Sequence, residues 1–204
     1  MNLPRTRWTG LRARHGAKHL LSPERQAAAA DLLRRAALDL PRDAVAVDLG
    51  AGSGLLTVPL AQRLASGRVV AVDVSPDMLE RLQERALCLG LQDRIQPLRA
   101  PADATGLPDG IARVVATAML LHEVPDPSAV LTEAFRLLQP GGQLLAHDFV
   151  ARRFSFVARW RHPGPAYGHL AAADLAERIQ RAGFTLRHHR VEGAMQDALA
   201  VKPA

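Results

Sequence analysis

The chain alternates between two kinds of segment from residue 44 to residue 201, and this alternation limits the folds open to it. Short apolar runs of strand length lie at 44–49, 68–74, 95–99, 112–118, 143–149, 184–191 and 194–201. Segments with apolar residues at helical spacing lie at 23–40, 55–65, 76–89, 128–138 and 171–182. Strands that alternate with helices predict a parallel sheet covered on both faces. We therefore expect a single open α/β domain.

Length and composition agree with one ordinary globular domain. The chain has 204 residues, of which 48% are hydrophobic and 23% charged. Its one cysteine, Cys88, excludes an intramolecular disulfide framework and a zinc site of the CxxC type. The longest nearly apolar stretch without charge, 114–121, is far shorter than the roughly 20 residues that cross a bilayer. We therefore expect no transmembrane segment.

The charge is unevenly distributed along the chain. Residues 1–47 and 151–204 each hold nine basic and four acidic side chains, whereas 48–150 holds eight basic and twelve acidic ones. Basic surfaces attract phosphates, acidic substrates or membranes, but arginine-rich solvated faces give the same counts and are favoured on charge alone. Residues 1–23 lack the apolar stretch of a secretory signal. We expect them to stay in the mature protein, and the protein to be cytoplasmic.

The first strand is followed by a loop in which glycine occupies every second position, Gly50, Gly52 and Gly54. Glycine lets the backbone turn tightly and approach a ligand, at the sheet edge where α/β proteins bind ligands. The spacing fits neither the dinucleotide fingerprint nor a P-loop, which argues against a nicotinamide dehydrogenase. The carboxylate of Asp48 would repel a pyrophosphate but suits an ammonium or sulfonium. The alternative is a plain tight turn between strand and helix.

A second acidic residue, Asp73, ends the second strand. A carboxylate at this place can accept hydrogen bonds from both hydroxyls of a ribose. It could equally cap the next helix. A glycine loop together with an acid at the second strand end is more specific than either feature alone.

Six segments resemble the class I S-adenosylmethionine-dependent methyltransferases. They are 47–54 (VDLGAGSG), 72–79 (VDVSPDML), 102–104 (ADA), 107–110 (LPDG), 121–127 (LHEVPDP) and 137–145 (LLQPGGQLL). The last two are similar to the small-molecule, "type 11" branch related to the ubiquinone and menaquinone C-methyltransferases. The resemblance covers roughly residues 15–192. It implies a doubly wound, Rossmann-like, mostly parallel sheet of seven strands.

The resemblance also implies which residues hold S-adenosylmethionine. The glycine loop would line its methionine part, with Asp48 near the ammonium group, and Asp73 would hold the ribose. Val74, Met78, Asp103 and Ala104 would contact the adenine, and Thr117 and Met119 would lie near the methionine tail and the transferred methyl. These residues are Asp48, Gly50, Ala51, Gly52, Asp73, Val74, Met78, Asp103, Ala104, Thr117 and Met119. Met78 could equally be a core residue of its helix. We expect 44–204 to form the cofactor-binding domain and 1–43 to form a basic helical segment that caps the site.

Methyl transfer needs an aligned nucleophile, and it needs a general base only if the acceptor loses a proton. The candidates are His122, after the fourth strand, and His147, at the end of the fifth, because the pKa of histidine lies near neutrality. His122 could instead serve loop packing. Since side chains alternate along a strand, either His147 or its neighbour Asp148 should face away from the ligand. His15 and His19 lack a third ligand, so we expect no metal.

The sequence restricts the class of methyl acceptor mainly through the motifs that it lacks. The Asp/Asn-Pro-Pro-aromatic motif of nucleic-acid amine methyltransferases and the Pro-Cys nucleophile of the cytosine enzymes are absent, and aromatic residues make up only 4%. The segment 152–161, in which aromatic and arginine residues alternate, could be a lid, a membrane contact or a packed helix. We expect a small-molecule acceptor, apolar or anionic, and a monomer or homodimer. The alternatives are a methyltransferase recruited to RNA or DNA by the basic arms, and a cofactor-binding protein without activity.

Overall fold

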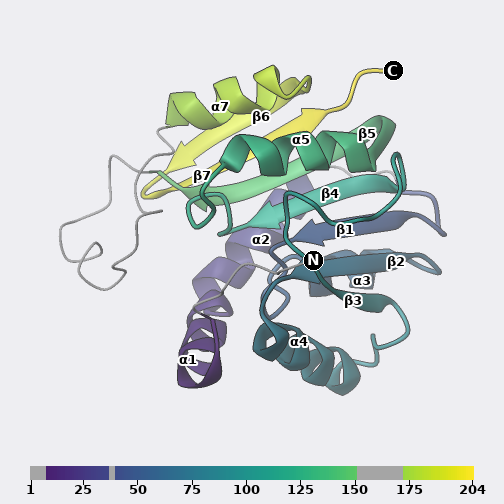
Figure 1. Ribbon diagram of the computed structural model, residues 1–204, viewed down its shortest axis with the longest axis vertical. Coiled ribbons are helices and arrows are strands. Elements are labelled where there is room, and N and C mark those ends of the chain that lie inside the picture. Colours follow the sequence, from purple (N-terminus) through teal and green to yellow (C-terminus); the bar gives the residue numbers. More distant parts are fainter. Residues whose placement is uncertain (1–7, 37–39, 151–171) are drawn as a thin grey trace.

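A seven-stranded sheet with helices on both faces forms the protein in a computed structural model, which describes residues 8–36, 40–150 and 172–204 (Figure 1). The strand order is β3-β2-β1-β4-β5-β7-β6. The strands are β1 (Val45–Leu49), β2 (Arg68–Asp73), β3 (Ile95–Arg99), β4 (Ala112–Ala118), β5 (Leu138–Phe149), β6 (Thr185–Glu192) and β7 (Met195–Val201). The first five are parallel, and β7 runs antiparallel to β5 and β6. The predicted α/β fold with a mostly parallel sheet is confirmed.

Two layers of helices cover the sheet (Figure 1). The helices are α1 (Gly10–Leu20), α2 (Pro23–Arg35), α3 (Thr57–Arg63), α4 (Pro76–Cys88), α5 (Pro127–Leu137) and α7 (Ala172–Arg181). Leu32 of α2, Leu60 of α3 and Leu82 of α4 share one core with one face of the sheet. Leu131 of α5 and Ile179 of α7 share a second core with the other face. We call these the α2 face and the α5 face.

The strand order places a crossover beside the first strand. The chain moves outward from β1 to β3 and then returns to the other side of β1 to form β4. Ligands bind in open α/β sheets where the order reverses, beyond the carboxyl ends of the strands. The candidate site therefore lies around the loops that follow β1, β2 and β4, with the end of β5 next to it.

The predicted segment boundaries agree with the structure except near three places. The strand predicted from residue 143 begins at Leu138, because Leu138 pairs with Ala112 of β4 and the backbones of Gly141 and Gly142 pair with Lys202. The sequence did not indicate where the N-terminal helix α1 begins and ends. The predicted helix 23–40 ends at Arg35, with 37–39 outside the described residues, as is all of the arginine and aromatic segment 152–161.

Three helices begin with the same two-residue pattern, in which an N-cap residue is followed by proline. Ser22, Ser75 and Asp126 cap α2, α4 and α5, and each accepts a hydrogen bond from the first turn. Such caps satisfy backbone N–H groups that a helix start leaves free, and proline at the first position loses no hydrogen bond. The predicted cap at Ser75 is confirmed. In the part of the chain that the structure describes, no helix has the length and apolarity to cross a membrane.

Candidate functional site

The glycine loop after β1 is fixed against the end of β2. The amides of Gly50 and Ala51 both donate to the carbonyl of Val72, each over 2.9 Å. Gly50 has φ +70°, and a Cβ there would lie 2.7 Å from the Cδ1 atom of Leu120. Only glycine adopts this conformation without strain, and only glycine leaves room for Leu120 from the loop after β4. The loop is therefore a rigid turn that ties together the ends of three strands.

Asp73, at the end of β2, joins this loop to the start of α4. One carboxylate oxygen accepts from the amide of Gly52 and the other from the amide of Ser75, each over 2.8 Å. Burial raises the pKa of Asp73, the two amides lower it, and the charge of Glu123 raises it further. Both oxygens keep a lone pair for another donor. Asp73 thus presents a pre-oriented acceptor pair near a second carboxylate, Glu123.

Asp48 is buried on the α2 face next to the glycine loop. The hydroxyl of Thr57 donates to its Oδ2 atom over 2.5 Å, whereas in the described part of the chain Oδ1 has no hydrogen-bond partner. Burial raises the pKa of Asp48 to about 7; the hydrogen bond from Thr57 opposes this change, and the charge of Asp73 adds to it. Leaving a buried carboxylate oxygen unpaired is costly. Asp48 is therefore suited to a cationic ligand that would pair with it.

The residues expected around an adenine occupy different environments. Asp103 and Ala104, beyond β3, are exposed, and Val74 is half-buried. Met78 is buried and packs with Ala13 of α1. The helix α1 thus covers Met78, which leaves its contact with an adenine a prediction.

The end of β4 carries an unpaired hydroxyl and a strained backbone. Thr117 is buried, and its Oγ1 atom has no partner. Met119 has φ +59°, which is unfavourable for a residue other than glycine, and its amide donates to the carbonyl of His147 over 2.8 Å. Such strain gathers at functional sites, where surrounding structure maintains it. Both observations mark the end of β4 as part of the site.

His122 and Asp148 form a buried pair on the α5 face. The Nδ1 atom of His122 lies 2.6 Å from Oδ1 of Asp148, while Oδ2 of Asp148 accepts from the amide of Leu121 over 2.7 Å. Nε2 of His122 lies 3.6 Å from Glu123, and its ring meets Phe149 edge to face. Burial alone lowers the pKa of His122, but the charge of Asp148 and its hydrogen bond outweigh it and raise the pKa to about 9. At neutral pH this residue is an imidazolium.

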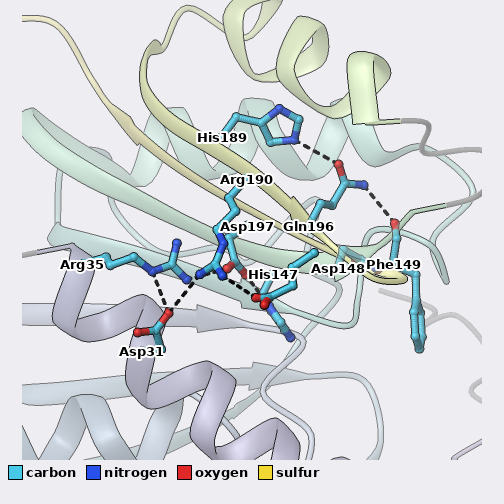
Figure 2. Close-up of polar contacts among 10 residues, drawn as sticks. Asp31, Arg35, His147, Asp148, Phe149, His189, Arg190, Gln196 and Asp197 are labelled. Atoms are coloured by element: carbon cyan, nitrogen blue, oxygen red, sulfur yellow. Dashed lines mark hydrogen bonds and ion pairs between the residues drawn. The ribbon is translucent and has the colours of Figure 1, made fainter.

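His147 points to the opposite face and is held by residues far along the chain (Figure 2). Its Nδ1 atom lies 2.5 Å from Oδ1 of Asp197 on β7, and Arg35 of α2 donates to the other oxygen of Asp197 over 2.6 Å. Arg35 also donates to Asp31 over 2.8 Å. Burial raises the pKa of Asp197, but the hydrogen bonds and charges of His147 and Arg35 lower it overall. The Nε2 atom of His147 is buried and has no hydrogen-bond partner among the described residues.

The two predicted histidines therefore lie on opposite faces of the sheet, and each is paired with a different carboxylate. The expected alternation along β5 is confirmed, with His147 on the α2 face and Asp148 on the α5 face. Sequence reasoning missed Asp197 and Arg35. No local pattern marks Asp197, because its contact joins residues 50 positions apart.

Known proteins share both the sequence and the fold of this chain. Residues 47–146 match a family described as "Methyltransferase domain". A ubiquinone/menaquinone biosynthesis C-methyltransferase of Vibrio parahaemolyticus is 30% identical over 167 residues, which are 74% of this chain and 62% of that protein. A trans-aconitate 2-methyltransferase of Methylobacterium radiotolerans is 36% identical over 123 residues, which are 59% and 43% of the two chains. This chain thus spans less than two thirds of the length of either relative.

Solved structures give the same fold at lower identity. A chain from the complex between the Haloferax volcanii Trm112 methyltransferase activator and a methyltransferase aligns with a TM-score of 0.83 and 18% identity, over 98% of this chain and 100% of that one. An S-adenosylmethionine-dependent methyltransferase from Aquifex aeolicus aligns with a TM-score of 0.73 and 20% identity, over 92% and 97%.

Proposed function

Since this chain belongs to the class I S-adenosylmethionine-dependent methyltransferases, we propose that it transfers the cofactor's methyl group to a small-molecule acceptor. One observation carries the proposal: the glycine loop donates to Asp73 over 2.8 Å, beside the unpaired oxygen of Asp48. Two carboxylates at neighbouring strand ends favour a nucleoside that bears positive charge. Relatives that act on small acids and quinone precursors support the choice of acceptor class.

The residues present fit the cofactor. Asp73 would accept hydrogen bonds from the ribose hydroxyls, and Oδ1 of Asp48 and Oγ1 of Thr117 are buried polar atoms that lack a partner. Such atoms are rare unless a ligand or water satisfies them. When bound, S-adenosylmethionine supplies a methyl group activated by its sulfonium. The remaining work of the protein is to hold the acceptor in line with that methyl and to keep water away.

The two histidines would then have different roles. Nδ1 of His147 donates to Asp197, so Nε2, which has no partner among the described residues, is the ring nitrogen left to contact the acceptor. His147 also shares the α2 face with Asp48. His122 is already protonated at neutral pH, so it cannot act as a base there. Its positive charge would suit an anionic acceptor instead.

The proposal is tested first by binding and then by transfer. Calorimetry should show binding of S-adenosylmethionine and S-adenosylhomocysteine but not of NAD. With methyl-labelled S-adenosylmethionine, label should then enter the small-molecule fraction of a cell extract and not its RNA or DNA. Label in nucleic acid would favour recruitment through the basic arms, and binding without transfer to any fraction would favour a protein without activity. The cytoplasmic location and the monomeric or dimeric state stay predictions.

The affinity for S-adenosylmethionine should depend on the protonation of Asp48. Because the pKa of this carboxyl is about 7, it is charged above pH 7 and neutral below, and only the charged form attracts the cationic cofactor. Affinity should therefore fall several-fold between pH 8 and pH 6. Calorimetry across this range measures the change. In Asp48→Asn the affinity should be weaker throughout and nearly independent of pH, and a steep dependence retained in this variant would contradict the assignment.

A further inference from the structure

The residue Trp8 bridges two loops of the candidate site that lie far apart in the sequence. Its indole Nε1 donates to Oε2 of Glu123, after β4, over 2.7 Å. Its carbonyl accepts a hydrogen bond from the hydroxyl of Ser75, the N-cap of α4. Two residues later, the amide of Gly10 donates to the side chain of Asp77, also on α4. The chain at Trp8 therefore spans from the end of β2 to the loop after β4.

Trp8 spans the space between Ser75 and Glu123, and Asp73 lies near both of these residues. Ser75 donates its amide to Asp73, and Glu123 lies close enough to Asp73 for the two carboxylates to repel each other. Trp8 contacts both neighbours of Asp73 directly. Anything whose ribose is held by Asp73 must therefore lie next to the Trp8 segment.

The indole is held in place by the helix that follows it. A Cβ on Gly16 of α1 would lie 2.2 Å from the Cζ3 atom of Trp8, so the ring packs directly against the backbone of this helix. Trp8 also packs with the cluster of Ala13, Ala17 and Met78, which fastens α1 to α4. The absence of a side chain at Gly16 provides the space for the ring. Trp8 is thus a specific part of the fold and not a residue of a loose end.

We propose that Trp8 covers the adenosyl group of bound S-adenosylmethionine, and we call this cover the roof. Its hydrogen bonds to Ser75 and Glu123 form a bridge that holds the roof closed over the cofactor. This inference rests on the proposed cofactor site around Asp73. The aromatic ring provides an apolar cover for the nucleoside, and its N–H holds the carboxylate of Glu123 in place through a hydrogen bond. The cofactor enters and leaves when this bridge opens. The capping role expected of residues 1–43 is thereby assigned to Trp8, together with its partners Ser75 and Glu123.

The test uses the small number of tryptophans in the chain, which are Trp8 and Trp160. In Trp160→Phe, Trp8 is the only source of tryptophan fluorescence. Saturation with S-adenosylhomocysteine should change the emission of this variant and should lower the quenching of Trp8 by acrylamide. Trp8→Ala in the same background has no tryptophan, so its release is followed with radiolabelled S-adenosylhomocysteine displaced by an excess of unlabelled ligand. Release should be at least about tenfold faster than with Trp8, and the dissociation constant should rise in proportion.

Two further variants separate a roof from a merely structural residue. Glu123→Ala removes the acceptor of the indole N–H and should accelerate release, whereas Glu123→Gln keeps an acceptor oxygen and should accelerate it less. Leu11→Ala, at an exposed position of α1, is the matched control and should leave release unchanged. Melting temperatures show whether each variant folds.

The outcomes distinguish the roof from the cofactor site itself. If S-adenosylhomocysteine binds the parent but Trp8→Ala, correctly folded, releases it at the parental rate, the roof is wrong and the cofactor site stands. Unchanged Trp8 emission and quenching at saturation would also overturn the roof. If calorimetry shows no binding to the parent, the proposed function itself fails.

Discussion

Replacing Asp73 with asparagine should lower the affinity for S-adenosylmethionine by about two to four orders of magnitude. Hydrogen bonds to charged groups contribute about 1.5 to 3 kcal/mol each, and Asp73 is placed to accept two of them from a ribose. Since each 1.4 kcal/mol corresponds to about a tenfold change, the loss of both bonds accounts for this range. Isothermal titration calorimetry at pH 8, with Asp48 charged, measures the change.

The control for this prediction is an aspartate of the same chain that lies outside the site. Asp93 is exposed in the turn after α4, so Asp93→Asn should bind with parental affinity. Asparagine at position 73 keeps one oxygen that can accept from the amide of Gly52 or from that of Ser75, but its NH2 group cannot accept from the other amide, so the melting temperature must show that the variant folds. An affinity of folded Asp73→Asn within a few-fold of the parent would show that the ribose is held elsewhere.

Replacing Asp148 with asparagine should destabilise the protein by about 3 to 5 kcal/mol at pH 6. Removing one partner of a buried ion pair leaves the other charge uncompensated, and this is the magnitude that such changes cause. Asp148 also accepts from the amide of Leu121, a bond that asparagine can retain. Urea unfolding of parent and variant measures the difference.

The pH dependence of this difference identifies His122 as the group responsible. The pKa of His122 is about 9 in the folded protein and about 6.5 when unfolded, so its pairing stabilises the fold fully below pH 6.5 and loses that effect as the pH rises through 9. The gap between parent and Asp148→Asn should therefore shrink from pH 6 to pH 9.5. Asp109→Asn breaks an exposed pair with Arg136 and should cost at most about 1 kcal/mol. A gap for Asp148→Asn that stayed constant with pH would exclude the imidazolium.

The fold could be predicted because its determinants are local. Apolar strands, helical spacing and N-cap–proline pairs such as Ser75 with Pro76 are written in consecutive residues, and the strands at 95–99 and 112–118 are found with the predicted bounds. The glycine loop could be predicted for the same reason, since the left-handed conformation of Gly50 needs glycine at that position. These features require no knowledge of what packs against them.

The contacts of the site could not be predicted, because they join distant residues. The extension of β5 back to Leu138 depends on pairing with Ala112 and Lys202, and the partner of His147 is Asp197. The bridge from Trp8 to Glu123 spans 115 positions. The sequence identifies a histidine, but it does not show which carboxylate will lie beside the imidazole and shift its pKa. The sequence therefore named both histidines but could not tell which carboxylate each of them contacts.

The place of β7 in the sheet has a consequence for how the chain is made. This strand is synthesised after β6 but lies inside it, between β5 and β6. Until β7 emerges from the ribosome, the outer edge of β5 has a row of unpaired backbone groups, and such edges recruit other strands. His147 lacks its carboxylate for the same interval, because Asp197 belongs to that strand. The strands β1 to β4 are synthesised earlier. The part of the proposed cofactor site that they form can therefore fold before the part that depends on β5 and β7.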